Sequence, residues 1–243
     1  MSTAVRQSAR KQEGGLGLQL DEGTRKSHSV AENTAFVTGF FRGLSNRKSF
    51  SALVCAYYHI YGAMEKALDE SGDENVRAMD FSQLRRMEQL RADMAYFFGP
   101  SWQSQPASPA TAAYVAHIEE IAKNKAYLLV AHQYTRYLGD LFGGQMMGGM
   151  ASRSLKLEDG QGITFYKFDG IPNNGEFIEA WYGKLNALAL SEEQRAEVVE
   201  EGNLVFALNI DLLEELEGNG VITALRFALD SLGRYLRSKL FKR

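Results

Sequence analysis

The sequence predicts an all-α protein that folds as a single-domain bundle of about eight helices. Prolines are few, 4 among 243 residues, and apolar residues return at helical intervals over long runs. With 45% hydrophobic residues, the chain can bury one sizeable core. This length also allows two small domains, but the sequence shows no internal repeat or low-complexity tract. We therefore expect one domain.

The helices are expected to follow one another along the chain, joined by polar segments. The predicted helical ranges are 24–36, 45–70, 81–98, 111–122, 125–153, 175–188, 192–216 and 221–241. The third range ends at Gly99-Pro100, because proline cannot continue a helix and restricts the residue before it. The segment Gly218-Asn-Gly220 separates the last two ranges.

Three segments are expected to lie outside the regular bundle. Residues 1–19 are polar, basic and glycine-containing, which predicts a flexible N-terminal arm before a main domain over 20–217. Residues 218–243 are expected to form a C-terminal basic amphipathic helix. Residues 157–174 are irregular in pattern, with a short extended piece expected at 163–168.

The amino-acid balance excludes several classes of function. The net charge is −3 with both signs spread along the chain, so the footprint of a nucleic-acid-binding protein is absent. The single cysteine, Cys55, lies in an apolar run, which predicts a buried residue, no internal disulfide and a reducing compartment. No apolar run reaches the length of a membrane span, and no secretory signal is present. We therefore expect a soluble protein.

The stretch over residues 136–153 has helical spacing but contains five glycines. Each costs a helix roughly 1 kcal/mol relative to alanine, so the glycines need another reason. Gly139, Gly143 and Gly144 stand at i, i+4 and i+5, which leaves one face without side chains. Either another helix or a flat ligand could pack there. Asp140 favours the ligand, because a carboxylate is a poor choice for a dry seam between helices.

Among the histidines, His28 alone has a carboxylate four residues on, Glu32. On a helix, that carboxylate can orient the imidazole, as the acceptor beside a metal-binding histidine usually does. His59, His117 and His132 are expected to be structural, which is the commoner role of a lone helical histidine. The chain has no zinc-site spacing. One histidine facing a glycine strip with an acid suits a planar iron macrocycle.

Four stretches of the chain resemble heme oxygenase, in order, from about residue 18 to 217. They are residues 24–41, 58–61, 128–145 and 206–216. The run Tyr-Thr-Arg-Tyr-Leu-Gly-Asp-Leu-x-Gly-Gly-Gln at 134–145 is the most specific. The resemblance implies a helical bundle with haem between a proximal N-terminal helix and a glycine-rich distal helix. It also implies cleavage of haem to biliverdin, carbon monoxide and free iron with O₂ and electrons, haem being both substrate and cofactor.

The resemblance also implies a role for each site residue. His28 would bind the iron, oriented by Glu32, and Gly139 and Gly143 would lie on the distal face of the haem. Asp140 would hold an ordered water that supplies the proton for the reaction. The residues implied in that water network are Tyr61, Arg136 and Asn209. Further residues implied to contact the haem are Arg25, Tyr134, Gly144 and Phe206.

Several positions differ from the pattern of the family. Asp21 stands where Lys or Arg is usual, and Ile178 and Tyr182 stand at positions that are normally basic. These positions surround the haem propionates, so the biliverdin isomer stays open, and Lys184 or Lys26 are the candidates to compensate. Phe142 replaces the usual Ser. Gly148-Gly149 replaces a pair of Lys residues, which leaves the docking of the electron donor open.

Three functions stay open on the sequence alone. They are an active heme oxygenase, a haem-binding carrier or sensor without turnover, and a structural protein whose glycines serve dimer packing. Asp140 favours the enzyme. The resemblance to soluble members of the family implies ferredoxin or a flavoprotein reductase as electron donor, and the cytoplasm or the plastid stroma as location. The oligomeric state is left open.

Overall fold

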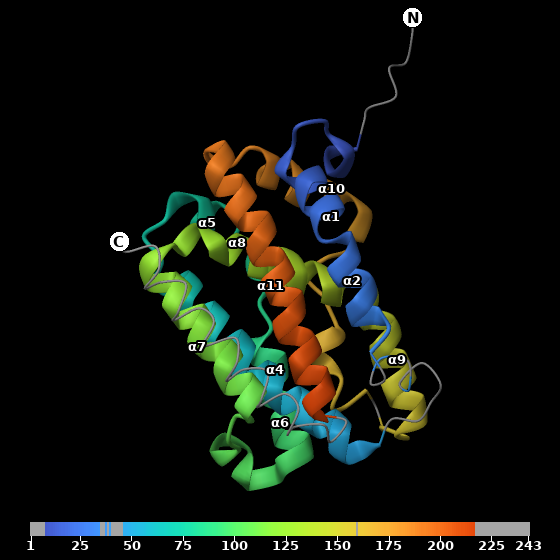
Figure 1. Ribbon diagram of the computed structural model, residues 1–243. Coiled ribbons are helices and arrows are strands. Elements are labelled where there is room, and N and C mark those ends of the chain that lie inside the picture. Colours follow the sequence, from blue (N-terminus) through green and yellow to red (C-terminus); the bar gives the residue numbers. More distant parts are fainter. Residues whose placement is uncertain (1–7, 35–36, 38, 40–45, 159, 217–243) are drawn as a thin grey trace, which may run out of the picture.

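Helix α11 (Glu192–Leu216) runs down the front of the molecule as seen in Figure 1, and other helices pack along it. The computed structural model describes residues 8–34, 37, 39, 46–158 and 160–216, and every regular element within these ranges is a helix. The all-α prediction is therefore confirmed. The long helix predicted over 192–216 has these bounds in the structure, and Val198, Val205 and Leu212 lie seven residues apart on its buried face.

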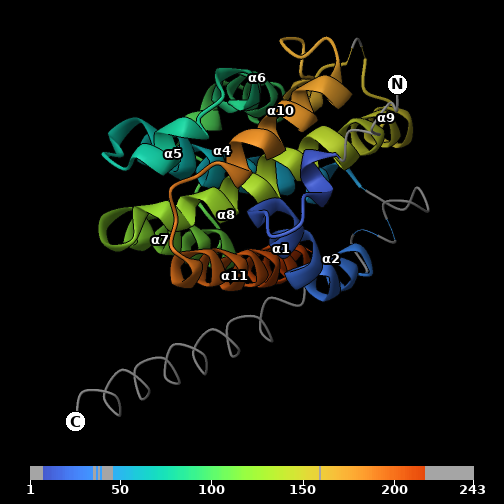
Figure 2. The same ribbon diagram turned by 90° about the horizontal axis from the view of Figure 1, so that it is seen from above.

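The other helices pack on two sides of α11. On one side lie α1 (Leu16–Gly23) and α2 (Arg25–Glu32); on the other lie α7 (Pro109–Asn124) and α8 (Leu129–Gln133) (Figures 1 and 2). Helix α4 (Arg47–Glu70) packs against both α6 (Met87–Phe98) and α7. The core lies between these helices.

Shorter helices and turns connect the long ones. The remaining α-helices are α5 (Glu74–Ala78), α9 (Gln145–Ser154) and α10 (Asn174–Asn186). Short 3-10 turns are η1 (Ala9–Lys11), η2 (Ser82–Leu84), η3 (Gly99–Ser104), η4 (Ala126–Leu128) and η7 (Thr164–Tyr166). Side chains of Asn46, Asp73, Ser108 and Asn173 accept backbone hydrogen bonds at the starts of four helices.

The extended piece expected at 163–168 is a 3-10 turn instead. The Asp93 carboxylate on α6 accepts hydrogen bonds from the backbone N–H groups of Thr164 and Phe165, both at 2.9 Å. These are the donors that a strand would have paired with another strand. A buried acid from a distant helix thus decides the conformation, and the local sequence carries no sign of it.

The prediction of a flexible arm over residues 1–19 is wrong for residues 8–19. Helix α1 begins at Leu16, and both Leu16 and Leu20 are fully buried against the bundle. Upstream of it, Asn186 on α10 donates a hydrogen bond to the Ala9 carbonyl at 2.7 Å. The polar composition concealed these contacts. Residues 1–7 and the basic helix expected over 218–243 lie outside the described residues.

Two expectations from composition can be compared with the described residues. Cys55 is buried, as predicted. Within the described part of the chain, we find no helix with both the length and the apolar character needed to cross a membrane.

Leu16→Ala should lower the free energy of unfolding by about 3 kcal/mol, because a fully buried leucine is lost from the core. Leu18→Ala, on the half-buried face of the same helix, should cost less than about 1.5 kcal/mol. Urea unfolding of the two variants and the parent chain measures both values. If both variants lost equally little free energy of unfolding, the prediction of a flexible arm would hold after all.

Candidate functional site

The glycine-rich stretch forms one helical path from α8 into α9, but its middle is wound more loosely. Residues Tyr134–Leu138 and Asp140–Gly144 form π-helical turns rather than α-helical ones. Glycine weakens an α-helix, and π-turns inside helices are frequent at functional sites. Each π-turn contains one residue more than an α-helical turn. The side chains that follow it therefore point in directions other than those an uninterrupted α-helix would give them.

The glycines of this helix serve two different purposes. A Cβ placed on Gly139 or Gly143 would meet no atom of the described residues within 4 Å, so the backbone is bare there. A Cβ on Gly144 would lie 2.6 Å from Tyr166 Cδ1, and one on Gly148 would lie 3.0 Å from Tyr166 Cδ2. The expected open strip therefore contains Gly139 and Gly143. Gly144 was also expected there, but it is buried and packs against the Tyr166 ring.

A buried polar network surrounds Asp140. The Tyr61 hydroxyl on α4 donates a hydrogen bond to Asp140 Oδ2. Arg136 Nη2 lies 3.4 Å from both carboxylate oxygens, while Arg136 Nη1 donates to Asn209 Oδ1 on α11 at 2.8 Å. The structure thus brings together all four residues that the resemblance grouped, from three separate parts of the chain.

The environment of Asp140 alters its acidity. Burial raises the pKa of the Asp140 carboxyl, and the positive charge of Arg136 and the Tyr61 hydrogen bond oppose this rise only in part. The Arg136 guanidinium is itself fixed by the Tyr57 ring, whose centroid lies 4.2 Å away. Asp140 is therefore a better proton acceptor than an ordinary surface aspartate.

His28 lies on α2 with its side chain 55% exposed. Its Nδ1 atom lies 3.6 Å from Glu32 Oε2. The carboxylate therefore faces Nδ1, and the second ring nitrogen, Nε2, does not face it. The ring also makes an edge contact with Phe206 on α11, with centroids 5.5 Å apart. Phe206 and Asn209 are one turn apart on α11. The same helix therefore contacts both His28 and the Asp140 network.

Exposed apolar side chains gather on the two helices that carry His28 and Asp140. Among the described residues, the large hydrophobic side chains classed as exposed are Val30 at 51%, Phe142 at 51% and Met146 at 57%. Val30 belongs to α2, and the other two belong to the glycine-rich helix. Exposed apolar groups next to bare backbone are typical of a ligand surface.

Two further expected residues lie near this region. Arg25 is exposed at the start of α2, three residues before His28. Tyr134 is half-buried, and its hydroxyl interacts with Thr24 and Tyr182. Burial and the neighbouring Asp21 charge raise the pKa of Tyr134.

Sequence reasoning missed a second polar cluster. Glu201 on α11 lies within hydrogen-bond distance of His117 Nε2 at 2.6 Å and His132 Nε2 at 2.8 Å. Burial alone would raise the pKa of Glu201, but these two hydrogen bonds outweigh it and lower the pKa to about 2. The cluster joins α7 and α8 to α11. A search for partners four residues away on one helix could not find it, because the acid comes from another helix.

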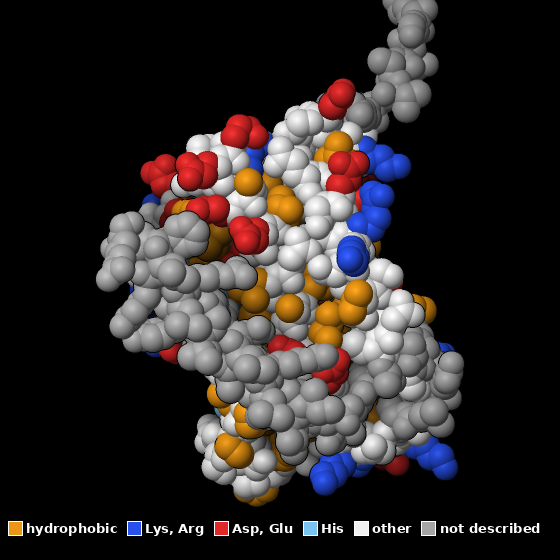
Figure 3. Space-filling model, in the orientation of Figure 1, with side chains coloured by type: hydrophobic (Ala, Val, Ile, Leu, Met, Phe, Trp, Pro, Cys, Tyr) orange, Lys and Arg blue, Asp and Glu red, His pale blue; other side chains and the backbone are white. Residues whose placement is uncertain are grey.

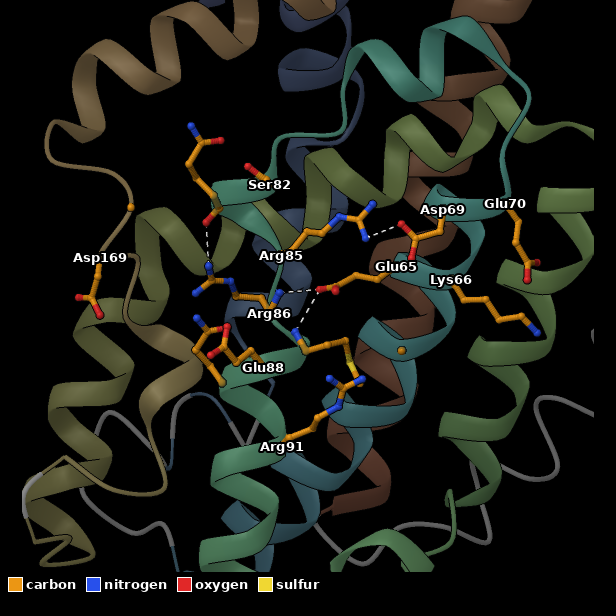
Figure 4. Close-up of a pocket in the computed structure, with 15 residues that line it drawn as sticks. Glu65, Lys66, Asp69, Glu70, Ser82, Arg85, Arg86, Glu88, Arg91 and Asp169 are labelled. Carbon is orange, nitrogen blue, oxygen red and sulfur yellow. Dashed lines mark hydrogen bonds and ion pairs between the residues drawn. The ribbon is translucent and has the colours of Figure 1, made fainter.

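A charged hollow of about 610 Å³ lies elsewhere in the molecule, between α4, α6 and residues 169–170 (Figure 4). Two of its charged side chains, Glu65 and Arg85, are paired within the fold. Glu65 accepts hydrogen bonds from the backbone N–H groups of Arg86 and Met87, and Arg85 pairs with Asp69 and Asp80. No predicted site residue lines this hollow, so we interpret its charged groups as structural.

Comparison with known proteins now decides the family. The sequence model of the heme oxygenase family matches residues 15–215. The chain belongs to the heme oxygenase family. It is 40% identical to heme oxygenase 1 of a Nostoc species over 206 residues, which cover 84% of this chain and 87% of that one. It is 39% identical to heme oxygenase 2 of Synechocystis over 208 residues, which cover 83% of each.

Solved structures agree. The crystal structure of heme oxygenase-1 from the cyanobacterium Synechocystis in complex with heme has a TM-score of 0.81 and 36% identity, covering 90% of this chain and 99% of that one. Heme oxygenase-2 from Synechocystis, in complex with heme and NO, gives 0.81 and 37%, covering 90% and 92%. This heme oxygenase is thus an oxidoreductase, and the reaction of its family cleaves haem to biliverdin, carbon monoxide and iron.

The two kinds of glycine should respond differently to alanine. Gly144→Ala should lower the free energy of unfolding by about 1–3 kcal/mol, because the new methyl group meets the packed Tyr166 ring. Gly139→Ala should leave stability unchanged or raise it by up to about 1 kcal/mol, because its surroundings are open and alanine favours a helix. Thermal unfolding of the two ligand-free variants provides the comparison, and equal effects would contradict the division.

Proposed function

We propose that this heme oxygenase binds haem between α2 and the glycine-rich helix that runs from α8 into α9. His28 would bind the iron, and Asp140 would lie on the opposite face of the haem. One observation carries the proposal: the backbone is bare at Gly139 and Gly143, and the exposed Val30, Phe142 and Met146 lie on these same two helices. A large, flat and apolar ligand suits such a surface. Helix α2 and helix α9, which continues the glycine-rich helix, lie toward the right of the molecule in Figures 1 and 2.

The donor set supports an iron macrocycle. A single exposed imidazole is a normal axial ligand of haem iron. Glu32 faces Nδ1 of His28, which favours the tautomer that leaves Nε2 as the ligand atom. The edge contact with Phe206 limits rotation of the imidazole. His28, Glu32 and Phe206 would thus hold the iron side of the site, and Arg25 and Tyr134 would lie near its rim.

The other face would handle the proton. Haem, when bound, supplies the iron that activates O₂ and the ring that is cleaved. Asp140 would hold a water molecule and pass a proton through it, a role that its raised pKa suits. Arg136 and Asn209 would keep the carboxylate in place, and Tyr61 would occupy one of its oxygens. Gly139 and Gly143 would let the ligand approach the backbone.

The reaction also consumes electrons. We propose ferredoxin or a flavoprotein reductase as the donor, and the cytoplasm or a plastid stroma as the location. Support comes from the resemblance of the chain to soluble members of the heme oxygenase family. Reduction of the hemin-loaded protein by each donor class, compared at equal concentration, tests this part.

His28→Ala should remove the bond to the iron and reduce the rate of biliverdin formation by more than about 100-fold. Loss of a residue that only supports a metal ligand already costs about 10–100-fold. Added imidazole should restore the absorption spectrum of the hemin complex. His59→Ala is the matched control, because Nε2 of His59 on α4 instead lies 3.0 Å from the carbonyl oxygen of Gln105, which follows η3. An unchanged hemin spectrum in the His28 variant would refute its role as ligand.

Asp140→Ala should still bind hemin, since His28 is untouched, but should form biliverdin at least about tenfold more slowly and shift toward peroxidase-like oxidation. Single-turnover assays with product chromatography measure both changes. Asp169→Ala, an exposed acid at the charged hollow, is the control and should keep the parent rate. An unaltered bilin yield from Asp140→Ala would exclude the proton role.

A further inference from the structure

The N-terminal turn η1 carries a cation to the edge of the haem site. The guanidinium carbon of Arg10 lies 5.9 Å from the ring centroid of Phe142 and 5.9 Å from that of Tyr182. Phe142 stands between the bare Gly139 and Gly143 and is itself exposed. Arg10 therefore reaches across from the start of the chain to the glycine-rich helix.

This turn is held in place by several contacts with α10. Glu179 accepts hydrogen bonds from the Ser8 hydroxyl at 3.0 Å and from the backbone N–H of Ala9. Asn186 donates to the Ala9 carbonyl at 2.7 Å and accepts from the Gly17 N–H at 2.8 Å. The position of Arg10 thus follows from contacts on both sides of it in sequence.

Arg10 brings a positive charge next to Tyr182 and Asp21. Tyr182 is almost fully buried beside α1. Gly17 leaves room for its ring, because a Cβ there would lie only 2.5 Å from Tyr182 Cδ1. Asp21 on α1 adds a negative charge, and Arg10 pairs with it. The hydrogen bond that Arg10 donates to the Asp21 carboxylate raises the pKa of Arg10 above its ordinary value, so the guanidinium stays charged. Its side chain remains 42% exposed, which leaves donors toward solvent.

Haem brings two propionate carboxylates to the rim of any site that buries its ring. We propose that Arg10 binds one haem propionate, so that the N-terminal turn supplies an anchoring cation that the neighbouring Asp21 and Tyr182 do not provide. This inference rests on the proposed haem site. Figure 3 shows Lys and Arg side chains along the edge formed by α1 and α2, the part of the chain that carries Arg25 and Lys26. The propionates would face this positively charged edge.

A charge-specific pair of ligands tests the proposal. The full-length chain and its variants are titrated with hemin and with hemin dimethyl ester, whose propionates carry no charge, and dissociation constants are read from the absorption change. Arg10→Gln should weaken hemin binding about fivefold, a modest factor because the side chain is partly exposed. The dimethyl ester should bind the variant and the parent equally, and Arg10→Lys should recover most of the hemin affinity.

Arg195→Gln is the matched control. Its guanidinium contacts the same N-terminal segment, at the Gly14 carbonyl 3.4 Å away, but is not paired with Asp21. It should bind both ligands as the parent does. Equal hemin affinity in Arg10→Gln and parent would overturn the proposal, and so would equal weakening toward both ligands, which would indicate a loosened turn. A parent chain that binds neither ligand would instead refute the proposed haem site.

Discussion

The buried pair of Arg136 and Asp140 is the constraint on which the site depends. A carboxylate and a guanidinium inside a protein cost several kcal/mol each unless both are paired and hydrogen-bonded. Here Tyr61 and Asn209 supply the remaining partners, from α4 and α11. The network therefore requires three helices to meet in one arrangement, and the Asp140 carboxylate is positioned by the same contacts that join the bundle. Loss of any one of these partners would leave a charged group in the protein interior without its full set of hydrogen bonds.

The glycine-rich helix combines an open face with a packed one. The Tyr166 ring fills the space beside Gly144 and Gly148, so the helix packs closely on its buried side. Gly139 and Gly143 leave the other face uncovered. The π-turns make this division possible, because they turn Asp140 toward the interior while neighbouring glycines stay outside. Weak helix propensity is thus offset by tertiary packing on one side, while the backbone stays uncovered on the other.

Periodicity predicted most of the fold, because the buried residues of long helices such as α4 and α11 recur at helical intervals in the sequence. It failed at residues 8–19, where the buried Leu16 stands among polar residues and glycines, and at Thr164, where hydrogen bonds to Asp93 decide the turn. For the site, the i, i+4 pair of His28 and Glu32 could be read from spacing. The meeting of Tyr61 with Asp140, and of Glu201 with its two histidines, could not, because partners from different helices leave no local pattern. The grouping of Tyr61, Arg136 and Asn209 with the acid came only through family resemblance.

Helix α11 contacts the imidazole through Phe206 and the acid's network through Asn209, one turn further on. One helix thus links His28 on α2 to Asp140 on the glycine-rich helix. Because the two contacts lie on adjacent turns of α11, a shift of that helix would displace both together. The relative placement of the imidazole and the carboxylate therefore depends on a single long helix.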